Sequence, residues 1–417
     1  MRAHKVVGTQ AEILLRRAVD HDTRLYELDL IGTLNRNDVI EFGYGDHNRF
    51  EIVKTVLATT QDVESEVYFA IGFEFHIANI ANFSYICTHN RQIYFMQFRT
   101  SINISPSPSQ LDHSHRVVMI GSCFSEHIAE RMQRAGFHVT SNPFGIMFNP
   151  ASIAQTIERL ASVRMYSTDD LTLSGERWVS FDFHGDFASR SQQTALDAMN
   201  CAVERGTKAL READTVVLTL GTAWVYRQQG AVVANCHKLP SQMFTREMMS
   251  VEQIIELLTQ TIEQHLANKR VVLTISPVRH VADGLADNSL SKAVLRVAAA
   301  NVAARLEQVD YFPSFEIMND DLRDYRFYEA DMVHPTAVAV DYIWERWREW
   351  AIAPSAGVAM HESERLWRAA LHRSSDPQSE AHREFCRKMN ERIDALSSQY
   401  PDANWVALRP FFALDEK

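Results

Sequence analysis

The sequence predicts an α/β protein whose parallel sheet is covered by helices on both faces. From residue 115 onward, short apolar runs alternate with long stretches of helical periodicity. The runs are continuous rather than alternating with polar residues, as is typical of strands buried on both faces. The composition, with 46% hydrophobic and 23% charged residues among 417, is that of a chain able to form a sizeable core.

Four strands are expected at the apolar runs 116–121, 213–221, 270–278 and 309–317. Helices are expected between them at 126–136, 194–213, 251–269 and 291–309. The third of these helices has Ser250 at its N-cap and Gln253 three residues later, which is a capping box. The remaining chain is predicted to be mostly helical, at 344–350, 361–373 and 379–400.

The composition changes abruptly near residue 100. All 12 prolines and all 7 tryptophans lie after residue 105. An extended linker is expected at 101–115, where Pro106 and Pro108 fix the backbone. Residues 1–95 are expected to form a small accessory α/β domain with apolar runs at 51–60 and 66–75. The alternative is a misplaced start, with the working protein beginning at Met96.

Charge and cysteine content limit the classes of function. The net charge of −11 disfavours a protein that binds nucleic acid mainly through electrostatics. The five cysteines are odd in number and form no CxxC pair, so neither a disulfide framework nor a thiolate zinc site is expected. The N-terminus lacks the pattern of a signal peptide, and charged and polar residues interrupt the apolar stretch 67–86. A cytoplasmic protein without a membrane partner is expected, and its oligomeric state stays open.

The strongest local signal is GSCFS at 121–125, where a predicted strand ends and a helix begins. Open α/β sheets place their sites at the carboxyl ends of strands. The hydroxyl of Ser122 could face such a crevice, and its backbone N–H could bind an oxyanion. The alternative is that Ser122 is an ordinary helix N-cap.

A second signal is EADMVHP at 329–335, between the fourth strand and a helix. Asp331 and His334 are three residues apart, a spacing that can place a carboxylate against Nδ1 of an imidazole. Nε2 could then take the proton of a serine hydroxyl. The alternative is that Asp331 caps the next helix, with Pro335 in its first turn.

Six motifs in order resemble the GSCFA-domain family, which is placed with the SGNH/GDSL-type hydrolases. They are GSCFSEHIAERM, NPFGIMFNP, TLGTAWVY, NCHKLP, SPVRHVADG…NSLSKAVL and FPSFEIMNDDLRDYRFYEADMVHP. The resemblance covers about residues 96–400. It implies a three-layer, flavodoxin-like α/β/α domain, which is expected at 96–350. The helical periodicity of the tail at 351–417 indicates helices that pack on this domain.

The resemblance also implies a Ser–His–Asp site. Ser122 matches the nucleophile of the first family block, and Asp331 and His334 match the last block. Gly145 matches the second-block glycine that donates an N–H to the oxyanion. Ser122 and Gly145 are therefore the two expected backbone donors.

The third block departs from the family pattern. An asparagine of G-x-N-D usually completes the oxyanion hole there, whereas this chain has Gly221-Thr222-Ala223-Trp224. Losing one such donor costs about 3–4 kcal/mol of transition-state stabilisation. Thr222, Asn235 or His237 could replace it, and the sequence does not choose among them.

Other polar residues follow predicted strands. His237, Lys238, Arg279 and His280 could bind an anionic or sugar-like substrate, or could serve as loop and capping residues. His280 is also a rival general base if His334 points away.

Further residues are expected near the site in supporting roles. Asp283, Asn288 and Lys292 could support the site, with helix capping by Asp287 or Asn288 as the alternative. Cys123, next to Ser122, is expected to be an inert thiol.

These residues and the resemblance predict a serine esterase that acts through an acyl-serine. Analogy with related hydrolases implies that the substrate is an O-acyl ester of a carbohydrate or a small acyl ester. No cofactor and no metal are expected, because no P-loop, GxGxxG or clustered ligand set is present. Two alternatives stay open. One is an acyltransferase with the same triad, and the other is a binding module that has lost activity.

Overall fold

The computed structural model describes residues 99–372, 374 and 376–413, with the side chain of Asp283 left out, and the backbone of five earlier strands. The chain divides into two units, Met1–Phe95 and Met96–Lys417. In the first unit, β1 (Arg2–Lys5), β4 (Val39–Tyr44) and β5 (Asn48–Val53) form an antiparallel sheet, and β2 (Glu12–Ala18) pairs with β3 (Tyr26–Ile31). The apolar run expected at 66–75 and most of that at 51–60 lie outside the described residues.

The second unit is built on a five-stranded sheet in which every neighbouring pair is parallel. Its members are β6 (Arg116–Gly121), β7 (His138–Ser141), β10 (Thr215–Leu220), β14 (Arg270–Ile275) and β15 (Val309–Phe312). Their spatial order is β15-β14-β10-β6-β7. Counted along the chain this is 2-1-3-4-5, the flavodoxin-like order, so the expected fold class is confirmed.

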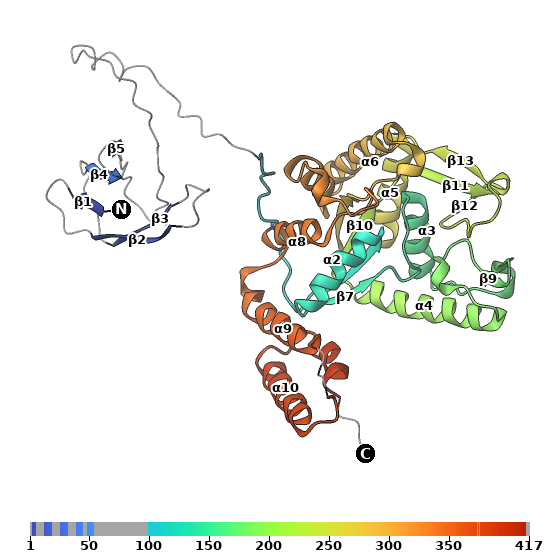
Figure 1. Ribbon diagram of the computed structural model, residues 1–417. Coiled ribbons are helices and arrows are strands. Elements are labelled where there is room, and N and C mark those ends of the chain that lie inside the picture. Colours follow the sequence, from blue (N-terminus) through green and yellow to red (C-terminus); the bar gives the residue numbers. More distant parts are fainter. Residues whose placement is uncertain are drawn as a thin grey trace, which may run out of the picture. The chain divides into compact units, whose positions relative to one another are not determined.

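Helices cover both faces of this sheet. One face carries α3 (Pro150–Ala161), α4 (Gln192–Glu212), α5 (Val251–His265) and α6 (Leu285–Arg305). The other carries α2 (Cys123–Arg134) and α8 (Ala337–Ala351). Strand side chains alternate between the faces: Val118 joins the first cluster and Val117 the second. Figure 1 shows this layered arrangement.

Several elements and one strand boundary differ from the prediction. The strand β7 and the helix α3 were not expected, and the predicted strand over 313–317 is wrong. The chain there forms α7 (Ser314–Glu316) and a π-helical turn, η6 (Ile317–Asp321). Pro313 explains the change, because it has no N–H to continue a strand ladder, and its carbonyl accepts from the Ile317 N–H (2.9 Å).

Two small antiparallel additions lie outside the main sheet. One is the pair β8 (Thr172–Ser174) and β9 (Arg177–Val179). The other is a three-stranded sheet of β12 (Ala231–Val233), β11 (Trp224–Gln228) and β13 (Thr245–Met248). Both are inserted between elements of the α/β layers.

The tail is helical, as predicted, and contains α9 (Gly357–Ala370), α10 (Glu380–Gln399) and the 3-10 helix η9 (Val406–Phe412). These elements form a hydrophobic cluster of their own. Two hydrogen bonds attach the tail to the end of α2: the Asn404 N–H donates to the Gly136 carbonyl (2.8 Å), and the Ser363 hydroxyl to that of Arg134 (2.9 Å). No helix in the described part of the chain is both long and apolar enough to cross a membrane.

Candidate active site

The candidate site lies where the carboxyl ends of β6, β10 and β14 meet at one edge of the sheet. Strand β6 ends at Gly121, which has φ +152°, and a Cβ there would lie 2.2 Å from the carbonyl oxygen of Thr219. Only glycine fits so close to the neighbouring strand. Its N–H donates to Oδ1 of Asn142 (2.8 Å), so the turn that presents Ser122 is fixed on both sides.

Ser122 occupies the N-cap position of α2, but its side chain does not cap the helix. The side chain is almost fully buried, and its hydroxyl donates to Oγ of Ser276 (2.9 Å). The capping interpretation is therefore not what the structure shows. Because a hydroxyl has one proton, that of Ser122 is directed at Ser276 and not at a histidine in this arrangement.

Ser276 was not predicted from the sequence. It follows β14 directly, and its N–H continues the sheet by donating to the Leu220 carbonyl (2.8 Å). Its position in SPVRH, immediately after an apolar run, was the available signal, because residues at that place face the carboxyl edge of the sheet. Ser276 begins a five-residue segment, 276–280, which contacts both Ser122 and the loop that carries His334.

Asp331 and His334 form the expected pair. Nδ1 of His334 donates to Oδ2 of Asp331 (2.6 Å), and Oδ1 accepts from the N–H groups of Val333 (2.8 Å) and His334 (3.0 Å). These hydrogen bonds lower the pKa of Asp331 to about 2, so the carboxylate stays ionised. The following helix α8 is capped by Thr336, whose hydroxyl accepts from the Ala339 N–H (3.3 Å). Asp331 therefore serves the imidazole and not the helix.

Arg279 supports the loop that carries the pair. Its N–H donates to the Val333 carbonyl (3.2 Å), and its guanidinium donates to that of Met332 (3.5 Å) and lies over the Tyr328 ring (3.8 Å). The structure thus shows Arg279 in contact with the Asp–His loop. Its predicted contact with substrate stays a prediction.

His334 lies within electrostatic range of two other histidines of the site. Burial lowers the pKa of His127 on α2, as do Arg131 and His334, whereas Glu130 and Glu126 act in the opposite direction. Burial also lowers the pKa of His280, to about 4, with contributions from Lys292 and His334. The hydrogen bond from the Arg279 N–H to the Val333 carbonyl places the His334 loop beside the segment that Ser276 begins.

The predicted backbone donor Gly145 makes a different contact. Its N–H donates to the Asn142 carbonyl (2.8 Å), closing a turn. A Cβ at this position would lie 2.2 Å from Cβ of His184, so glycine is needed here for packing. In this structure the Gly145 N–H is not free for an oxyanion.

Thr222 is also engaged. Its N–H donates to the Phe148 carbonyl (2.9 Å), and its hydroxyl shares a hydrogen bond with Ser291 (3.1 Å). Neither group of Thr222 is free for an oxyanion in this arrangement.

Asn235, His237 and Lys238 form a tight turn after β12. Oδ1 of Asn235 accepts from the His237 N–H (2.8 Å), and Nε2 of His237 donates to the Ser180 carbonyl (2.7 Å). His237 and Lys238 have φ of +50° and +59°. These contacts join the turn to the loop after β9. The roles expected of Asn235, His237 and Lys238 at the site stay predictions.

Of the residues expected in supporting roles, Lys292 and Asn288 contact residues of the site, and the side chain of Asp283 lies outside the described part of the chain. Lys292 is 1% exposed, and its Nζ donates to the carbonyls of Gly221 (2.6 Å) and Ser276 (2.7 Å). Burial lowers its pKa to about 7. Oδ1 of Asn288 accepts from the His280 N–H (2.9 Å). Burial raises the pKa of the Cys123 thiol, as expected of an unreactive cysteine.

The chain is therefore a flavodoxin-like α/β/α protein. A serine begins the first helix of this domain, and an Asp–His pair precedes its last helix, α8. Residues 116–347 match the GSCFA family, and residues 363–412 match the GSCFA domain protein, C-terminal domain. The chain belongs to the GSCFA family.

Two further comparisons say less. No curated protein matches the chain. A solved structure from Streptococcus pneumonia, provisionally named as a platelet activating factor, shares 11% identity over 57% of this chain and 84% of that one. Its TM-score is 0.29, so it carries no argument here.

Proposed function

We propose that this protein is a serine esterase of the SGNH type, which hydrolyses an O-acyl ester through an acyl-serine. The observation that carries the proposal is the hydrogen bond between the Asp331 carboxylate and Nδ1 of His334 (2.6 Å). The loop that carries this pair is hydrogen-bonded to the segment 276–280, and Ser276 of that segment contacts Ser122. That pairing leaves Nε2 of His334 for proton transfer. Ser122 contributes a hydroxyl that caps no helix.

The proposed reaction has two steps. The hydroxyl of Ser122 turns from Ser276 to Nε2 of His334 and attacks the ester carbonyl, while His334 takes its proton. The leaving alcohol departs with that proton, which gives acyl-Ser122. Water then attacks the acyl group, again losing a proton to His334, and Ser122 regains a proton as the carboxylic acid leaves. Asp331 stabilises the imidazolium, and the Ser122 N–H at the start of α2 stabilises the oxyanion.

The exposure of the pair bears on the substrate. The side chains of His334 and Asp331 are about half exposed, at 47% and 48%. The exposure of this pair to water favours a hydrated ester, such as an acylated carbohydrate or a small acyl ester, over a lipid chain that must be buried. No metal and no organic cofactor takes part in the proposed route.

Hydrolysis of p-nitrophenyl acetate, together with labelling by a fluorophosphonate, tests the proposal. The wild-type protein should turn over the ester and be labelled, and Ser122→Ala should lose both, because the proposed nucleophile is then absent. Cys123→Ser is the matched neighbouring control and should keep both. Turnover retained by Ser122→Ala would contradict the proposal.

Two alternatives give different results in the same assays. An acyltransferase would label at Ser122 but form a new ester when an acceptor alcohol is added. A binding module is favoured by one observation, the donation of the Ser122 proton to Ser276. A binding module would not be labelled by the fluorophosphonate, but a ligand would raise its melting temperature.

A further inference from the structure

We propose that His280 is the missing oxyanion donor, supplying an Nε2–H where related hydrolases use an asparagine amide. This inference rests on the esterase function proposed above. It assigns to His280 a catalytic contact with the developing oxyanion, in place of the substrate-binding and base roles that its sequence position suggested.

The end of β10 offers no donor of its own. The N–H groups of Gly221 and Thr222 both donate to the Phe148 carbonyl, at 2.7 and 2.9 Å. The next residue, Ala223, is buried and has no polar side-chain group. A side chain from another element must therefore supply any third donor at this strand end.

His280 brings a polar atom to this place. Its Nε2 is buried and has no hydrogen-bond partner among the described residues. The same atom lies 3.3 Å from the position that a Cβ on Gly221 would take. Buried polar atoms are nearly always hydrogen-bonded, so an orphaned one at a candidate site calls for a partner that arrives with the substrate.

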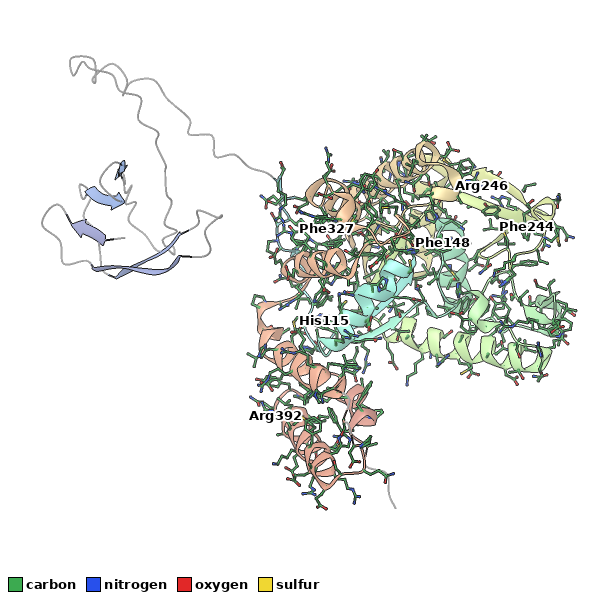
Figure 2. The ribbon with its side chains drawn as sticks, in the orientation of Figure 1. His115, Phe148, Phe244, Arg246, Phe327 and Arg392 are labelled. Carbon is green, nitrogen blue, oxygen red and sulfur yellow. The ribbon has the colours of Figure 1, made fainter. Side chains whose placement is uncertain are left out.

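His280 is held in place through its backbone and through its ring. Its backbone N–H donates to Oδ1 of Asn288 (2.9 Å), and its ring meets that of Phe148 edge to face, with centroids 5.5 Å apart. Figure 2 labels Phe148 within the α/β part of the chain. A donor fixed before the reaction needs no reorganisation when charge develops.

His280 also lies on the segment that joins the site together. Four residues earlier, Ser276 accepts the proton of the Ser122 hydroxyl (2.9 Å). One residue earlier, the Arg279 N–H holds the loop of His334. The segment 276–280 thus links the nucleophile, the base and the orphaned Nε2.

The charge state of His280 fits a donor better than a base. Burial, with Lys292 and His334 nearby, keeps the pKa of His280 at about 4, so the ring is neutral near pH 7. A neutral imidazole carries one N–H, which the proposal places on Nε2. As Ser122 bonds to the carbonyl carbon, the π electron pair moves to oxygen, and Nε2–H donates to that oxygen without transferring its proton. Collapse of the intermediate returns the pair to the carbonyl.

Substitutions at His280 in the full chain test this role. His280→Phe and His280→Ala should lower kcat/KM for p-nitrophenyl acetate by 10²–10³-fold, mainly through kcat, since one donor is lost. His280→Asn or His280→Gln, which restore an amide N–H, should recover at least tenfold of that loss. His361→Gln, at an exposed histidine of α9, should match the wild type. Melting temperatures identify any variant that fails to fold.

The outcomes separate this inference from the function on which it rests. An active wild type whose His280→Phe variant is equally active overturns the donor role alone. So does an equal loss in all four variants, because an amide then restores nothing. Loss of the rising limb of the pH profile in His280→Asn would make His280 the base instead. If the wild-type protein is neither labelled by the fluorophosphonate nor hydrolyses the ester, the proposed function is contradicted, and so is the donor role of His280.

Discussion

Lys292 illustrates how much of this site depends on single buried residues. A fully buried ammonium group is rare, and here Nζ donates to the carbonyls of Gly221 and Ser276. These carbonyls follow β10 and β14, so one side chain joins the ends of two neighbouring strands. The lysine stem is enclosed, and burial lowers the pKa to about 7.

Replacing this lysine should change how stability depends on pH. Between about pH 7 and 10.5 the unfolded chain holds a proton on Lys292 that the folded chain has lost. Wild-type stability therefore gains from this residue as pH rises through that window, by a few kcal/mol at most. In Lys292→Met the gain should be absent, so urea unfolding at pH 7 and 9.5 should show a smaller rise. Lys208→Met, at an exposed lysine, should parallel the wild type. Equal slopes in Lys292→Met and wild type would contradict this account.

The part of the site that is local in sequence could be predicted from sequence. Asp331 and His334 are three residues apart, and their hydrogen bond needs only that spacing. The contact between Ser122 and Ser276 joins residues 154 apart, and no spacing rule shows which strand ends become neighbours. Gly145 was assigned to the oxyanion from the family resemblance, and no sequence pattern reveals that its N–H closes a turn on Asn142.

At the scale of elements, continuous apolar runs located the central strands, because strands buried on both faces must be apolar throughout. The capping box of Ser250 and Gln253 is present at the start of α5, as predicted. The edge strand β7 was missed, since its sequence HVTS contains no apolar run. The start of helix α3 could have been predicted, because Asn149 is its N-cap and Pro150 is its first residue.

Thr336 begins α8 directly after the Asp331–His334 loop, and its cap contributes to the fold. Thr336→Ala should lower the free energy of unfolding by about 1 kcal/mol, because the Ala339 N–H loses its acceptor. Ser250→Ala removes the corresponding cap of α5 on the opposite face and should cost about the same. Chemical denaturation measures both. No loss in Thr336→Ala, with the expected loss in Ser250→Ala, would show that α8 does not depend on this cap.

At the scale of the whole molecule, all residues assigned to the site belong to the unit Met96–Lys417. That unit contains the complete parallel sheet, both helical layers and the helical tail. Sequence composition placed a boundary near residue 100. What residues 1–95 do could not be predicted, because they contain no motif that carries chemistry.

A chain that begins at Met96 should therefore fold and react without the first unit. We expect the shortened protein to be soluble, to keep its melting temperature within a few degrees, and to hydrolyse p-nitrophenyl acetate at the full-length rate. Thermal melting and the esterase assay check this. An insoluble or inactive product would assign the first unit a role in folding or at the site.

The most direct test of the central claim is mass spectrometry of the protein after treatment with a fluorophosphonate. The account predicts one covalent adduct, on the peptide that contains Ser122, which forms quickly in the wild type and at least a hundredfold more slowly in His334→Ala. An adduct on another residue, or labelling of Ser122 at an unchanged rate without His334, would contradict the proposed pairing of nucleophile and base.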